Sequence, residues 1–89
     1  MKLKENLVLR QVADTWVVLA LTAANVDLNN MLKLNETGAI LWKVLERGGN
    51  LEAMADALTA EYNVSREQAL TDAAEFCTAL VKAGYAEAE

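Results

Sequence analysis

Few residues in this chain have the side-chain chemistry that catalysis requires. The sequence contains no histidine, one cysteine (Cys77) and one serine (Ser65). Without histidine the chain forms neither a serine–histidine catalytic triad nor a zinc site of cysteine and histidine. A single cysteine makes no disulfide within the chain, so a disulfide-stabilised secreted scaffold is excluded. These residue types predict a module that is not an enzyme, with no catalytic residues, in the cytoplasm.

Each remaining candidate for chemistry has a structural explanation. Cys77 lies on the apolar stripe of an expected helix, and no positively charged residue precedes it within one turn, so it is expected to pack as a small hydrophobic residue. Ser65 stands where a helix N-cap is needed. Trp16 and Trp42 are expected to pack in or beside the core. The acidic residues lie opposite apolar stripes on solvated helix faces, without the glycine-containing loop of an EF-hand. We therefore expect no metal and no cofactor.

The composition describes one small globular domain over residues 1–89. Hydrophobic residues make up 54% of the chain, charged residues 24%, and the net charge is −5. Residues 1–48 carry six basic and five acidic residues, whereas residues 49–89 carry two basic and eight acidic ones. An acidic surface repels phosphate, which argues against nucleic acid. The longest apolar run, 16–21, is far shorter than the roughly twenty residues that a membrane span needs.

The first third of the sequence predicts three short antiparallel strands. The runs 7–12 and 16–21 are apolar and β-branched, and the short polar break between them is typical of a hairpin. Residues 22–30 contain three asparagines and one aspartate, which favour a loop. The apolar tetrapeptide 31–34 is expected to be a third strand at the edge of the sheet.

From residue 35 onward the apolar residues repeat with a helical period. The expected helices are 36–47, 51–62 and 66–83, begun by the N-caps Asn35, Asn50 and Ser65 and ended by Gly48-Gly49, Asn63 and Gly84. The last residues, Glu87 and Glu89, are expected to fray. Strands followed by helices predict an α+β fold. Three strands and then a three-helix bundle resemble a winged helix-turn-helix with its strands placed first.

The strand over 31–34 is the element best suited to binding. An edge strand leaves backbone N–H and C=O groups unpaired, and another chain can complete them by β-augmentation. If the helix over 66–83 flanks this edge, the two elements form a groove with a backbone ladder on one wall and side-chain pockets on the other. The candidate peptide-binding residues are Met31, Leu32, Lys33, Leu34, Thr71, Asp72, Glu75 and Phe76. The acidic members predict a basic or polar residue in the bound peptide.

The segment Leu34–Trp42, LNETGAILW, resembles the signature of the PqqD-like family at the end of its third strand and the start of its first helix. Glu61–Val64 is similar to the family's eYdv turn. The resemblance extends from about Lys4 to Tyr85 and includes a closing-helix pattern formed here by Asp72, Phe76, Leu80 and Gly84.

This resemblance implies a peptide-recognition element, also called a RiPP recognition element. Such a domain is a peptide chaperone: it binds the leader of a ribosomally made precursor peptide and presents it to a maturation enzyme, often a radical S-adenosylmethionine enzyme. The leader adds as a strand beside 31–34 and packs against the helix over 66–83. Members that serve pyrroloquinoline quinone synthesis usually carry a proline-arginine element near the N-terminus and an Asp-Gly after the first helix. Leu3–Asn6 and Arg47–Gly49 stand there instead, so the product is left open.

Two other classes fit the same order of elements. A winged-helix DNA-binding module needs a basic recognition helix, whereas residues 66–83 carry Arg66 and Lys82 against three acidic residues. A homodimer or larger homo-oligomer formed through the strand edge at 31–34 would be purely structural, and nothing in the sequence excludes it.

Overall fold

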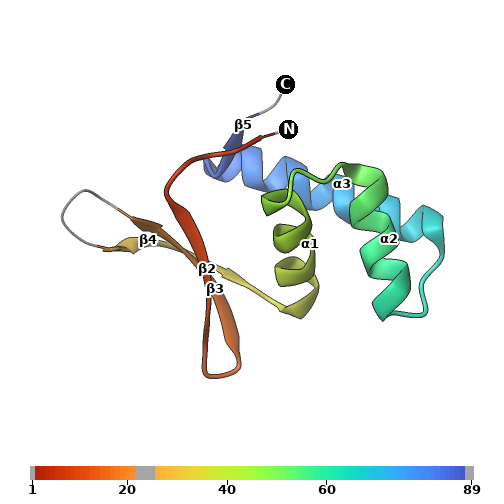
Figure 1. Ribbon diagram of the computed structural model, residues 1–89, viewed down its shortest axis with the longest axis horizontal. Coiled ribbons are helices and arrows are strands. Elements are labelled where there is room, and N and C mark those ends of the chain that lie inside the picture. Colours follow the sequence, from red (N-terminus) through yellow and green to blue (C-terminus); the bar gives the residue numbers. More distant parts are fainter. Residues whose placement is uncertain (1, 22–25, 88–89) are drawn as a thin grey trace. The chain divides into compact units, whose positions relative to one another are not determined.

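The computed structural model describes residues 2–21 and 26–87 (Figure 1). The elements in chain order are β1 (Lys2–Leu3), β2 (Leu7–Val12), β3 (Thr15–Leu21), β4 (Val26–Leu34), α1 (Glu36–Glu46), α2 (Leu51–Glu61), α3 (Arg66–Ala83) and β5 (Ala86–Glu87). They form two compact units. The first, the sheet unit, is Glu5–Ala39, and the second, the helical unit, is Met1–Lys4 together with Ile40–Glu89. The α+β fold predicted from the sequence is confirmed.

The sheet unit contains an antiparallel sheet in the order β2-β3-β4. The hairpin pairs Leu7 with Ala20 at one end and Val12 with Thr15 at the other, which leaves a two-residue turn. The first turn residue, Ala13, has a positive φ of 56°. Alanine rarely adopts this left-handed region, so the turn carries backbone strain that glycine would avoid. The predicted hairpin is thus confirmed. Its turn residues, Ala13 and Asp14, are not the pair that is typical of a two-residue hairpin turn.

β3 is the central strand. Its neighbouring residues Val17 and Val18 are 4% and 0% exposed, although successive side chains of a strand point to opposite faces. The continuous apolar run of this strand is consistent with burial on both faces. β2 and β4 are left as the two edges of the sheet.

β4 is longer than the sequence predicts. A loop was expected over 22–30, and this is wrong for 26–30, which extend the strand; residues 22–25 lie outside the described residues. The pairing shifts along the strand: Val18 opposes Leu32, but Ala20 opposes Asp27. β4 therefore contains extra residues at this point, as in a β-bulge. Such an irregularity accommodates the asparagine-rich sequence that had favoured a loop.

The helical unit is built around small residues where α2 and α3 meet. Its buried cluster consists of Leu41, Val44, Met54, Ala55, Leu58, Ala69 and Ala73. Alanines at the contact allow the two helix backbones to approach closely, while the larger side chains fill the remaining space. Trp42 is also fully buried, as expected.

All three predicted N-caps are confirmed. The side chains of Asn35, Asn50 and Ser65 accept hydrogen bonds from the backbone N–H three residues later, at 2.8, 2.9 and 3.1 Å. Gly84, with a φ of 85°, ends α3 in the left-handed conformation. Gln68 differs from the expected capping box, because its side-chain amide donates to Asp72 at 2.8 Å.

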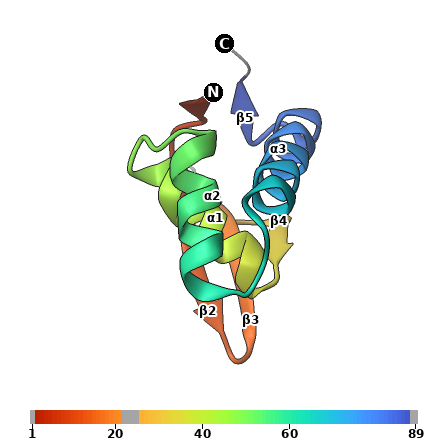
Figure 2. The same ribbon diagram turned by 90° about the vertical axis from the view of Figure 1, so that its right-hand side faces the viewer.

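The two chain ends pair with each other in β1 and β5, side by side in Figure 2. Lys2 opposes Glu87, and the Lys4 amide donates to the Tyr85 carbonyl at 3.0 Å. Ala86 is buried. The expected fraying of Glu87 is therefore wrong, while Glu89 lies outside the described residues. Strands of two residues are too short for a periodic signal in the sequence. None of the described helices is long and apolar enough to cross a membrane.

Candidate functional site

The exposed edge of β4 is the first part of the site. Leu32, Lys33 and Leu34 pair with Val18, Val17 and Trp16 of β3. Among the described residues no strand pairs with the other side of β4. Backbone N–H and C=O groups on that side are directed away from β3, so they are available to a further strand.

The register also settles which side chains share a face. Leu32 and Leu34 lie on the same face as their partners Val18 and Trp16, and both leucines are half-buried. Lys33 points to the opposite face and is exposed, and Met31 is 41% exposed. A peptide strand added to this edge would meet leucines on one face of the sheet and a lysine on the other.

The second part of the site is one face of α3. Thr71, Asp72, Glu75 and Phe76 are spaced so that they cover one side of the helix, because each residue advances about 100°. Asp72 is half-buried and accepts the Gln68 hydrogen bond, whereas Glu75 is exposed. Phe76 is half-buried and packs at the margin of the helical core. This face combines two carboxylates, a hydroxyl and an apolar ring.

The predicted site residues fall into two sets, one on β4 and one on α3, and the structure brings together the members within each set. The strand residues Met31–Leu34 belong to the sheet unit, and the four α3 residues belong to the helical unit. The predicted groove would take one wall from each unit, and it stays a prediction.

Cys77 behaves as a packed thiol. It is half-buried, its Sγ lies 3.8 Å from Sδ of the buried Met54, and burial raises the pKa of the thiol. A raised pKa reduces the thiolate fraction at neutral pH, which is the opposite of what a nucleophilic cysteine needs. Within the described part of the chain, no cluster of histidine, cysteine, aspartate and glutamate has the size to hold a metal ion.

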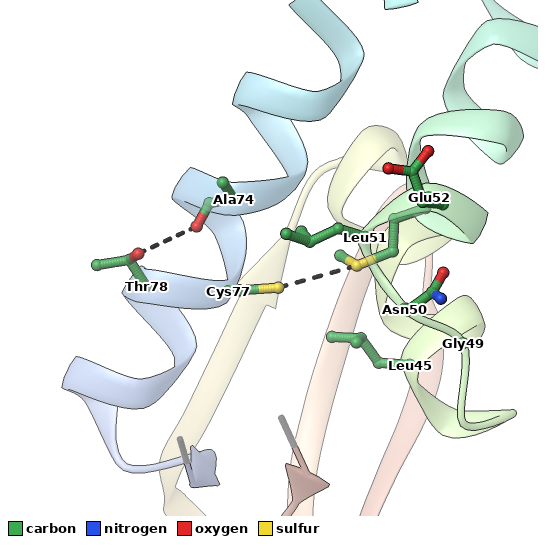
Figure 3. A pocket seen from close by; sticks show the side chains of 9 residues that line it. Leu45, Gly49, Asn50, Leu51, Glu52, Ala74, Cys77 and Thr78 are labelled. Carbon is green, nitrogen blue, oxygen red and sulfur yellow. Dashed lines mark hydrogen bonds between the residues drawn. The ribbon is translucent and has the colours of Figure 1, made fainter. Parts of the chain in front are cut away.

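A pocket inside the helical unit was missed by the sequence reasoning. It has a volume of about 500 Å³ and is lined by Leu45, Gly49, Asn50, Leu51, Glu52, Met54, Ala74, Cys77 and Thr78. Figure 3 shows Leu45 and Leu51 pointing toward α3, with Cys77 pointing back from that helix. The one signal in the sequence is Leu51, an apolar residue at the first position of α2, which is 42% exposed.

An antiparallel sheet with an open edge, followed by three capped helices, defines a small α+β domain suited to binding an extended peptide. The chain belongs to the PqqD family, because the family model described as "Coenzyme PQQ synthesis protein D (PqqD)" matches residues 15–86. No curated protein matches the chain in a sequence search.

Two solved structures are similar over the whole chain. "TbiB1 in Complex with the TbiA(beta) Leader Peptide" is 29% identical with a TM-score of 0.78, and the match covers 100% of this chain and 98% of that one. "Lasso peptide synthetase B1 complexed with the leader peptide" is 28% identical with a TM-score of 0.77, and the match covers 98% and 96%. Both relatives were solved with a leader peptide bound.

Proposed function

We propose that this chain binds the leader of a ribosomally made precursor peptide and presents it to a modifying enzyme. The observation that carries the proposal is the full-length similarity to two proteins solved with leader peptides, at 29% and 28% identity. Membership of the PqqD family supports it. The function belongs in the cytoplasm, where ribosomes make such precursors, and residues 1–89 act as one recognition domain.

The leader would add as a strand to the open edge of β4 at Met31–Leu34. Backbone hydrogen bonds along the ladder supply affinity with little dependence on sequence, and side-chain contacts supply specificity. In this proposal Thr71, Asp72, Glu75 and Phe76 of α3 contact side chains of the same leader. Their two carboxylates favour a leader with a basic residue, and Phe76 favours an apolar one.

The chain itself performs no chemistry in this proposal, and its one thiol has a raised pKa that suits packing. The modification is done by a partner, of which a radical S-adenosylmethionine enzyme is one example. The family description names a quinone coenzyme, and one solved relative belongs to lasso peptide synthesis. The proposal therefore identifies the ligand as a leader peptide and leaves the final product open.

Two adjacent proline substitutions test the edge mechanism. Proline removes a backbone N–H. The N–H groups of the consecutive residues Leu32 and Lys33 point to opposite sides of the strand. One points toward β3 and the other toward the open edge. Of Leu32→Pro and Lys33→Pro, one should keep the circular dichroism spectrum and melting temperature of the unchanged protein and yet lose leader binding. The other should be destabilised, because it loses a ladder hydrogen bond.

The ligand for this test is the leader of a short precursor peptide, to be sought among the genes that neighbour the gene for this chain, and calorimetry measures its affinity. Equal binding by both folded proline variants would show that the strand edge is not the docking site. No binding by the unchanged protein would overturn the proposed function itself.

A further inference from the structure

The pocket of the helical unit lies on a different side of α3 from the residues assigned to the leader. Ala74, Cys77 and Thr78 line the pocket. At about 100° per residue, the middle of this set lies roughly 140° around the helix from the middle of the set 71, 72, 75 and 76. A leader bound to the α3 face of residues 71, 72, 75 and 76 therefore leaves the pocket open.

The pocket is suited to accept an apolar side chain from another molecule. Its lining is mostly apolar, from Leu45, Leu51, Met54, Ala74 and Cys77. Leu51 is 42% exposed at the start of α2, although it lies among these apolar residues. Partly exposed apolar surface in a concave site is typical of a surface that another molecule covers.

The charge around the pocket selects the kind of molecule. Glu52 is the one charged residue in the lining, and it is held with Asp56 by the guanidinium of Arg66. Residues 49–89 carry eight acidic residues against two basic ones. A second copy of the chain would bring the same acidic face and be repelled, whereas a basic surface would be attracted.

We propose that this pocket docks the modifying enzyme, which inserts an apolar side chain carried next to a lysine or arginine. The inference rests on the proposed function and extends it: one side of α3 holds the leader, and another holds the enzyme that acts on the attached peptide. Holding both partners on one domain raises the effective concentration of the peptide at the enzyme without any change in the chemistry.

Cys77 reports directly on this pocket. It is the only cysteine in the chain, it lines the pocket, and it is half-buried. Alkylation by iodoacetamide, followed by mass spectrometry of the peptide that contains Cys77, therefore measures whether the pocket is covered. The bound enzyme should slow alkylation by about fivefold or more, and the leader alone should leave the rate unchanged.

The matched variants are Ala74→Phe, which fills the pocket from an exposed position on α3, and Ala60→Phe, an equal change at an exposed position of α2 outside the lining. The partners used are a modifying enzyme and a precursor leader, both to be sought among the genes that neighbour the gene for this chain. Ala74→Phe should weaken enzyme binding, measured by biolayer interferometry, by about tenfold. Leader affinity should stay within about twofold of the unchanged protein, as should both affinities of Ala60→Phe.

A second pair tests the charge. Glu52→Gln should weaken enzyme binding at low salt and flatten its salt dependence, while Glu61→Gln, on the last residue of α2, should not.

The inference is overturned if the enzyme binds Ala74→Phe as tightly as the unchanged protein, or if Cys77 of the enzyme-bound chain is alkylated at the same rate as in the free chain. It is also overturned if the leader alone protects Cys77, or if sedimentation shows a dimer that Ala74→Phe dissociates. Leader binding without any enzyme binding overturns this inference and leaves the proposed function intact.

Discussion

The sheet unit and the helical unit differ in the size of their buried cores and in the regularity of their backbones. The helical unit has a buried cluster of seven residues, regular helices, and two side-chain N-caps, Asn50 and Ser65. The sheet unit has two buried valines on β3, a strained turn at Ala13 and a register shift in β4. A buried core stabilises the helical unit, whereas the sheet unit keeps an open edge and irregular backbone. The region that is best suited to accept a peptide strand is thus the one with the smaller core.

The largest expected effect is a loss of stability on truncating a core residue, which should differ between the two units. Leu58 is 2% exposed in the helical core, so Leu58→Ala should lower the free energy of unfolding by about 2–5 kcal/mol. Leu9 of β2 is only half-buried, so Leu9→Ala should cost clearly less. Urea unfolding followed by circular dichroism measures both. An equal or larger cost for Leu9→Ala would remove the contrast between the units.

An intermediate effect concerns charge on the helical unit. Asp72→Lys removes the acceptor for Gln68 and reverses the charge on the α3 face assigned to the leader. Leader affinity should fall by about tenfold at low salt, and the loss should shrink as salt is added. Calorimetry at two salt concentrations measures this. Glu61→Lys, at the end of α2, is the control with the same charge change, and an equal loss there would indicate only a general electrostatic effect.

The smallest effect tests the strain in the sheet unit. Ala13→Gly places a residue that tolerates positive φ at the first position of the hairpin turn. The free energy of unfolding should rise by about 0.5–1 kcal/mol, because relief of strain exceeds the added flexibility of the unfolded chain. Ala79→Gly, at an exposed position in the interior of α3, should lower it by a similar amount. A stability loss at Ala13 would show that the turn is not strained.

Sequence reasoning succeeded where the signal is periodic or local. The spacing of apolar residues predicted α3 over 66–83 as found, and Asn50 and Ser65 were recognised as N-caps from residue type alone. It failed where long-range pairing decides the structure. Asparagines favour loops, yet Val26 and Asp27 pair with Leu21 and Ala20 of β3, and β4 begins at Val26. β1 and β5 exist only because the chain ends meet.

The candidate site shows the same division. The edge position of 31–34 was predictable from a short apolar run after a hairpin, and the register that separates Leu32 from Lys33 was not. The pocket beside α3 could not be predicted, because it depends on how Leu45, Leu51 and Cys77 approach from three helices. Helical spacing assigns residues to faces, but the hollow between helices is set by their packing.

The register shift in β4 has a consequence for solubility. A long, flat and regular edge strand is a template on which identical chains stack without limit, and this is how edge-to-edge aggregation begins. The shift between Val18 and Ala20 interrupts the regular ladder, and the exposed Lys33 places a charge beside the part that remains. Straightening β4 by deleting the extra residues would lengthen the surface offered to a peptide. It would equally offer that surface to every other copy of the chain, so the register shift shortens the regular ladder on which identical chains could stack.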